Sequence, residues 1–132
     1  MPSQLSEITN RSFALTSLDL TTLPQSVTRI KQEAFRHVSN VNIRVFGYTN
    51  GSELSAEDNR ITRIESDAFQ NCGQSVNEIW IKNSVTTLIE NCFQNFGKPD
   101  TTLVVHDASG LLTPENISMY FGTTNVELHS EV

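Results

Sequence analysis

One nine-residue pattern recurs along this chain, and one of its copies is Ile61-Thr62-Arg63-Ile64-Glu65-Ser66-Asp67-Ala68-Phe69. The pattern is an apolar residue, Ser or Thr, any residue, an apolar residue, three variable positions, a small residue and Phe. Three more copies end at Phe13, Phe35 and Phe93, so the four phenylalanines are 22, 34 and 24 residues apart. Such a period is typical of stacked repeats, and the long middle step indicates one period plus an insertion of roughly ten residues.

Each copy contains two kinds of local signal. Its apolar residues, for example Ile64, Ala68, Phe69 and Cys72, follow i, i+4, i+5 and i+8, which predicts a short helical turn with one apolar stripe. A β-branched or alternating run follows each turn and predicts a strand of period two. These predicted strands lie at residues 18–20, 41–45, 79–82, 103–106 and 126–129, in step with the phenylalanines.

One unit of this size cannot bury its apolar stripe alone, so the units must stack. The expected fold is an α/β solenoid with one parallel β-sheet, short helical turns opposite it and about five repeats, and its core is a single row of the four phenylalanines. We expect one domain over residues 1–132. It divides into an N-terminal unit or cap (1–22), central repeats (23–110) with an insertion loop (47–59), and a C-terminal cap (111–132).

Two segments suggest a family. Ser26-Val27-Thr28-x-Ile30-x3-Ala34-Phe35 and Ile64-x3-Ala68-Phe69-x2-Cys72 resemble the leucine-rich repeats of the BspA type. The resemblance runs from near Leu5 to near Leu128. It implies a leucine-rich-repeat right-handed coil, curved around a parallel sheet, and a role in protein binding or cell adhesion, commonly on a microbial surface. It implies no enzymatic activity.

Strand alternation predicts which residues face outward, because successive side chains point to opposite faces. With Ile79 and Ile81 inward, Trp80 and Lys82 face outward. One outward column is then Asp19, Asn42, Trp80, Val104 and Glu127, and its neighbour is Thr21, Arg44, Lys82, His106 and His129.

This outward face is the candidate binding site. Exposed Trp and Arg are enriched at binding hot spots. We hypothesise that the face binds a protein or another acidic ligand, with Trp80 as anchor. The alternative is that the insertion loop or a neighbouring molecule shields Trp80 and that the cations form a solvated face. The predicted partner-binding residues are Trp80, Arg44, Lys82, His106, Asn42 and His129.

The insertion loop at 47–59 contains the turn signal Asn50-Gly51 and the acidic residues Glu53, Glu57 and Asp58. Long loops on rigid scaffolds often contain the residues that recognise a partner. Equally often they are insertions without a role in binding, so both interpretations stay open. The loop does not match the ligand spacing of a calcium-binding EF-hand.

Composition narrows the class of function. Nine Lys and Arg against fifteen Asp and Glu give a net charge of −6, which argues against a nucleic-acid partner. No apolar run is long enough to span a bilayer, so we expect no membrane insertion. The first residues have no basic and apolar segments of a signal peptide. The family resemblance favours a location at the cell surface or secretion, whereas the absence of a signal peptide from this sequence gives no support for either.

The motifs of common chemistry are not found. Cys72 and Cys92 occupy positions that other copies fill with apolar residues, so they are expected inside the protein. His106 and His129 occupy equivalent positions on neighbouring predicted strands. Two histidines are too few ligands for a metal site. There is no Gly-rich phosphate loop and no nucleophile elbow. We therefore expect no enzyme, no metal and no cofactor.

The predicted function is a non-catalytic, adhesin-like protein-binding module that uses its exposed sheet face. The alternative is a small structural, accessory or decoration subunit of a larger assembly, such as a phage virion.

Overall fold

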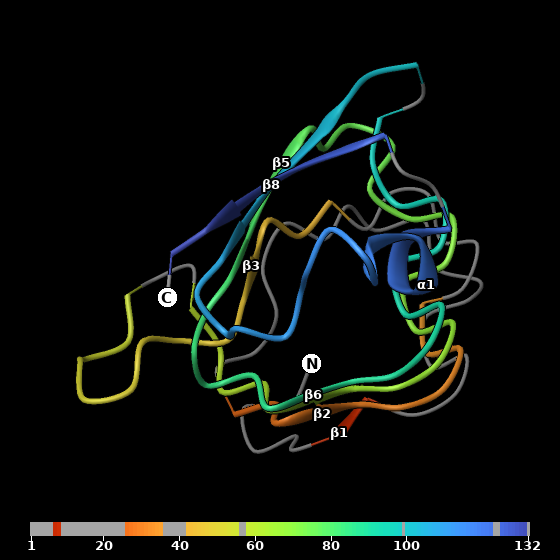
Figure 1. The fold of residues 1–132 in the computed structure, drawn as a ribbon. Coiled ribbons are helices and arrows are strands. Elements are labelled where there is room, and N and C mark those ends of the chain that lie inside the picture. Colours follow the sequence, from red (N-terminus) through yellow and green to blue (C-terminus); the bar gives the residue numbers. More distant parts are fainter. Residues whose placement is uncertain are drawn as a thin grey trace.

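The computed structural model describes residues 7–8, 26–35, 42–55, 58–98, 100–122 and 125–131. This part of the chain forms two four-stranded β-sheets, each made of parallel strands (Figure 1). One sheet has the strand order β1-β2-β4-β6, and the other has the order β3-β5-β7-β8. The elements are β1 (Glu7–Ile8), β2 (Arg29–Ile30), β3 (Val45–Phe46), β4 (Arg63–Ile64), β5 (Glu78–Ile81), β6 (Thr87–Leu88), β7 (Leu103–Asp107), α1 (Ile117–Phe121) and β8 (Val126–Ser130).

The prediction of a single sheet is wrong, because the copies that contain Phe35, Phe69 and Phe93 each contribute a strand to both sheets. The first half of the pattern, expected on a helical turn, forms the two-residue strands of the β1-β2-β4-β6 sheet. The register of this sheet follows the repeat, since Ile30 pairs with Ile64 and Ile64 pairs with Leu88. β-branched residues favour extended backbone, and an apolar pattern this short fits a strand as well as a helix.

Short turns, and not helices, carry the small residue and the Phe of the pattern at residues 32–35, 66–71 and 90–95. Glu33, Asp67 and Asn91 have left-handed backbone, with φ of 60°, 57° and 65°, which a right-handed helix does not include. Successive turns hydrogen-bond to each other; for example, the Phe35 N–H donates to the Ala68 carbonyl over 2.8 Å. Among the described residues, helix is confined to α1, at the end of this column of turns.

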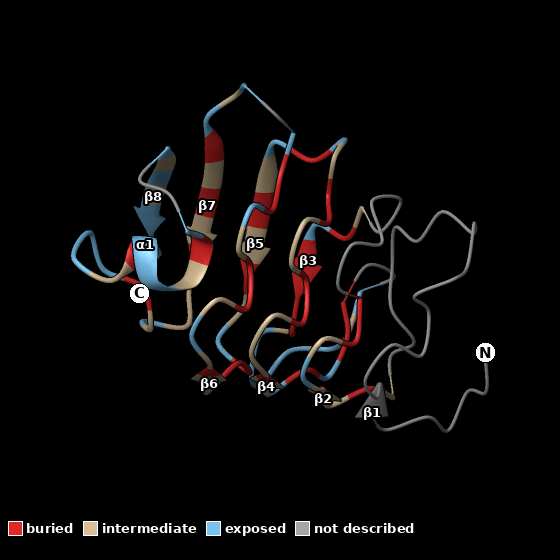
Figure 2. Cartoon of the chain, turned by 90° about the vertical axis from the view of Figure 1, so that its right-hand side faces the viewer, coloured by how far each residue is buried: buried red, intermediate tan, exposed pale blue. Residues whose placement is uncertain are grey.

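Three of the four phenylalanines of the pattern, Phe35, Phe69 and Phe93, form one row inside the protein, as predicted for them. The ring centroids of Phe35 and Phe69 are 5.3 Å apart, and those of Phe69 and Phe93 are 5.7 Å apart, with nearly parallel planes. Phe121 of α1 continues the row, with its centroid 5.1 Å from that of Phe93. Figure 2 shows buried residues on strands of both sheets. Phe13 lies outside the described residues.

The β3-β5-β7-β8 sheet contains four of the predicted strands. Ile79 and Ile81 are buried, and Glu78 and Trp80, which alternate with them, are partly exposed, so the predicted inward and outward faces are confirmed on β5. β7 has the same alternation. The predicted strand at 18–20, and the column members Asp19 and Thr21, lie outside the described residues.

The insertion loop is closed at its base by the buried side chain of Asn59. The Gly47 N–H donates to Asn59 Oδ1 over 2.6 Å, and Asn59 Nδ2 donates to the Val45 carbonyl over 3.0 Å. Gly47 has a φ of 91°, and a Cβ at this position would clash with the Ser84 hydroxyl. The loop therefore leaves the sheet through a position that only glycine fits.

Replacing Asn59 by alanine should lower the free energy of unfolding by about 2–3 kcal/mol, because a buried N–H and a buried carbonyl lose their partner. Urea unfolding followed by circular dichroism measures the change. The control is Asn83→Ala, since Asn83 is exposed and hydrogen-bonds to Asn50 on the outer turn. A loss for Asn59→Ala no larger than that of the control would contradict the role of Asn59.

Candidate functional site

Three rings form a row across the outer face of the β3-β5-β7-β8 sheet. Trp80 of β5 pairs in register with His106 of β7, which pairs with His129 of β8. The Trp80 and His106 rings are stacked, with centroids 4.9 Å apart and planes 9° apart. The centroids of His106 and His129 are 5.3 Å apart. We call these three side chains the aromatic row.

The predicted columns were wrong by two residues between β5 and β7, and they were also wrong between β3 and β5, where Val45 and not Asn42 pairs with Trp80. They set Trp80 beside Val104 and Lys82 beside His106, whereas Trp80 lies beside His106 and Glu78 lies beside Val104. A shift of two residues leaves every side chain on its predicted face, because side chains alternate with period two. The sequence pattern therefore fixed the face and could not fix the neighbours across the sheet.

The other predicted partner-binding residues differ in how close they lie to the aromatic row. Lys82 lines a hollow together with Trp80. Arg44 is exposed just before β3, and its carbonyl accepts the Trp80 N–H over 2.7 Å. Asn42 Oδ1 accepts the N–H of Ser75, which precedes β5. The structure thus places Lys82 and the Arg44 backbone beside Trp80, and it bonds Asn42 to the segment that precedes β5.

Two carboxylates bracket His106. Its Nε2 lies 2.6 Å from Glu78 Oε2, and its Nδ1 lies 3.0 Å from Glu131 Oε2. Carboxylates only accept hydrogen bonds, so two such bonds require an imidazolium with both nitrogens donating. The hydrogen bond to Glu78 is the main cause that raises the pKa of His106 above its ordinary value of 6.5; partial burial opposes the shift and Glu131 adds to it. These contacts therefore favour the protonated form of His106, whose ring is stacked on that of Trp80.

Sequence reasoning placed Glu127 on this face and missed Glu78 and Glu131. His129 Nε2 lies 2.8 Å from Glu127 Oε2, so both histidines of the row have acidic partners. A signal was present, because Glu78 and Glu127 each stand two residues before a ring of the row and hence on the same strand face. The predicted column of cations is accordingly flanked by acids, and the face carries both signs of charge.

Replacing Glu78 by glutamine should lower the pKa of His106, because the main contact that favours the imidazolium is lost. A raised folded-state pKa stabilises the fold fully below the unfolded-state pKa, and this stabilisation is lost as the pH rises through the folded-state pKa. The free energy of unfolding of the native protein should therefore be higher than that of Glu78→Gln. The difference should be largest near about pH 6 and should shrink toward about pH 9.

Histidine ring NMR signals measure this pKa, and urea unfolding measures the stability at each pH. Glu90→Gln removes an exposed carboxylate on a distant turn and serves as the matched control. The same His106 pKa in the native protein and in Glu78→Gln would show that the Glu78 contact does not hold the proton.

A hollow of about 180 Å³ opens beside the aromatic row. The insertion loop supplies one side of it, where the Ser55 N–H donates to Asp58 Oδ2 over 2.9 Å. Trp80 remains partly exposed at its edge, so the loop flanks the ring without covering it. The residues that line the hollow are Val45, Ser55, Asp58, Trp80 and Lys82.

Cys72 and Cys92 are buried free thiols, as predicted. Burial raises the pKa of the Cys92 thiol far above its ordinary value. Cys72 Sγ donates to the Phe35 carbonyl over 2.8 Å. The part of the chain that the structure describes has no group of three or more His, Cys, Asp or Glu that could hold a metal ion. No helix in that part has the length and apolar character needed to cross a membrane.

Comparison with known proteins gives one match. The family model of the BspA type leucine-rich repeat region matches residues 1–44 and 39–106. It places six copies of the repeat, where the spacing of the sequence predicted about five. No match is found among curated proteins or among solved structures.

Proposed function

Because the chain belongs to the BspA-type leucine-rich repeat family, we propose that it is a non-catalytic, adhesin-like protein-binding module. Its binding surface is the outer face of the β3-β5-β7-β8 sheet, with Trp80 as the anchor. The observation that carries this proposal is the aromatic row. The module is one domain over residues 1–132, wound as a right-handed solenoid with caps at 1–22 and 111–132.

The setting of Trp80 supports its role as an anchor. Its ring is stacked on His106, and its backbone N–H is fixed by the Arg44 carbonyl. A side chain that is already held in place loses little conformational entropy when a partner binds. The hollow beside it, with Lys82 on its rim, gives a partner side chain a place to enter.

The charges of the face support a protein partner over a uniformly acidic ligand. Arg44 and Lys82 lie at β3 and β5, whereas Glu127 and Glu131 lie at β8 and just beyond it. A uniformly acidic ligand would meet these carboxylates, while a folded protein can set opposite charges against each end. His129, exposed on β8, extends the contact surface, and Asn42 is a contact at the start of the sheet.

A binding role is favoured over catalysis by the state of the nucleophilic groups. A nucleophile or general base needs access to a ligand and a free atom to react. Cys72 and Cys92 are buried, and both ring nitrogens of His106 are hydrogen-bonded to carboxylates.

Site-specific crosslinking tests the surface directly. A photo-crosslinking amino acid at Lys82 should capture the partner from native host extract, and the same group at Thr86, exposed beside β6 of the other sheet, should not. The captured protein is then purified and titrated by calorimetry. Arg44→Ala should weaken its binding about fivefold or more, as loss of an interface arginine does.

Equal capture from Lys82 and Thr86 would reject the proposed face. Capture only of further copies of this chain, together with an oligomer in light scattering, would support the assembly-subunit alternative instead.

A further inference from the structure

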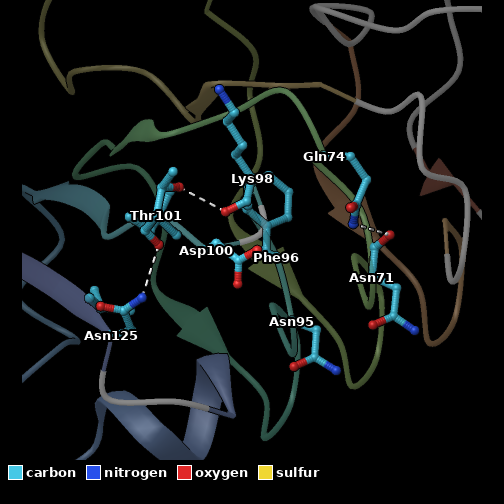
Figure 3. Close-up of a pocket in the computed structure, with 11 residues that line it drawn as sticks. Asn71, Gln74, Asn95, Phe96, Lys98, Asp100, Thr101 and Asn125 are labelled. Carbon is cyan, nitrogen blue, oxygen red and sulfur yellow. Dashed lines mark hydrogen bonds between the residues drawn. The ribbon is translucent and has the colours of Figure 1, made fainter.

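A second hollow lies where the column of turns meets the β3-β5-β7-β8 sheet (Figure 3). Its volume is about 430 Å³, which falls within the range of small-molecule sites. It contains no residue of the aromatic row. It is therefore a separate place on the molecule, and nothing in the proposed protein-binding role uses it.

Amides are the most frequent polar side chains in the lining of this hollow, which we call the amide hollow. Each amide offers both hydrogen-bond donors and an acceptor. Asn71 and Asn95 take the same position in successive copies, two residues after the Phe, so the stacked turns set their amides at two levels. The four amide residues that line the hollow are Asn71, Gln74, Asn95 and Asn125.

Hydrogen bonds within the lining hold its frame in place. Asn125 Nδ2 donates to the Thr101 carbonyl over 3.0 Å, and Thr101 Oγ1 donates to the Lys98 carbonyl over 2.8 Å. Within the described residues, the Asn95 side-chain amide and Gln74 Oε1 make no hydrogen bond, so both can serve a ligand. A frame that is formed in advance reduces the entropy cost of binding.

The remaining lining residues select against ions. Lys98 and Asp100 are both exposed at the hollow and carry opposite charges. A phosphate would meet the Asp100 carboxylate, and a divalent metal would find one carboxylate beside an ammonium group, where it needs several oxygen ligands. Phe96 and Leu103 are buried and supply apolar surface to the same hollow.

We propose that the amide hollow binds a neutral, hydroxyl-rich ring, of which a pyranose sugar is the common biological form. Hydroxyl groups around such a ring both donate and accept, as the amides do. The C–H groups of the ring match the apolar surface of Phe96 and Leu103. The absence of net charge in the ligand matches the balance of Lys98 and Asp100.

NMR titration of the ¹⁵N-labelled full chain tests the proposal. The probes are glucose, galactose, mannose and N-acetylglucosamine at millimolar concentrations, with inorganic phosphate as the anion control. At least one sugar should shift the backbone signals of Asn71, Asn95 and Thr101 in a saturable manner. Gln74→Ala should weaken that binding about five- to tenfold, the effect of one lost hydrogen bond, and Gln74→Trp should abolish it by filling the hollow.

The matched control is Gln32→Ala, because Gln32 is an exposed glutamine on the turn of another copy, outside the hollow. Its affinity for the sugar should equal that of the native protein. The proposal is overturned if no sugar gives saturable shifts, if only phosphate does, or if the shifts lie outside the hollow. Unchanged sugar binding by a folded Gln74→Ala or Gln74→Trp also overturns it.

Discussion

Replacing Phe69 by alanine should lower the free energy of unfolding by about 3–5 kcal/mol, the range for deletion of a buried phenylalanine ring. Phe69 is fully buried, and its ring is stacked between those of Phe35 and Phe93. Phe46 of β3 packs edge-on against it, with centroids 5.2 Å apart. The alanine variant therefore leaves a cavity at the centre of the row, lined by rings that cannot fill it without moving their own turns or strand.

Urea unfolding followed by circular dichroism measures this loss. Because domain stabilities are only about 5–15 kcal/mol, the milder Phe69→Leu, which deletes fewer buried atoms than alanine does, keeps the measurement possible if the alanine variant is unfolded. Met119→Ala, at an exposed apolar residue of α1, should stay within about 0.5 kcal/mol of the native protein. A loss below about 1 kcal/mol for Phe69→Ala would mean that the row does not hold the copies together.

Replacing Trp80 by alanine should weaken binding of the partner captured at Lys82 about thirtyfold, which corresponds to the 2 kcal/mol of a hot-spot residue. Trp80 supplies a large apolar surface that is only partly buried in the free protein. Loss of its stacking on His106 should cost the fold only about 0.5–1.5 kcal/mol. Calorimetric titration at neutral pH measures the affinity, and urea unfolding confirms that the variant is folded.

Met119→Ala is again the matched control, since Met119 is a large exposed apolar residue away from the sheet. It should bind the partner with native affinity. If Trp80→Ala binds as tightly as this control, Trp80 is not the anchor, although the surrounding face can still be the interface. Trp80→Phe separates the two effects, because it keeps a ring on His106 while it removes part of the contact surface.

The repeat allowed much of the fold to be predicted. The spacing of Phe35, Phe69 and Phe93 predicted their row, and burial of Cys72 and Cys92 followed from the apolar positions they share with other copies. These predictions succeeded because burial in a repeat depends on position within the copy, which the sequence displays directly.

The backbone path between these positions could not be predicted in the same way. An apolar residue four positions before a small one is compatible with a helical turn and with a strand that leads into a tight turn. The left-handed backbone of Glu33, Asp67 and Asn91 decides between them, since it ends any helix and lets each turn bond to the next. The left-handed position is Glu, Asp or Asn in the three copies, so no single residue type in the pattern identified it.

The candidate site was likewise predictable only in part. The sequence by itself determined that Trp80, His106 and His129 face outward, because alternation along each strand sets the face of every side chain. Only the tertiary structure decided that these rings stand side by side and that Glu78 and Glu131 hold His106 between them. The physical reason is that strand register is set by backbone hydrogen bonds and side-chain packing between strands that are far apart in sequence. A shift of one strand by two residues against its neighbour leaves the inward and outward pattern of its own sequence unchanged.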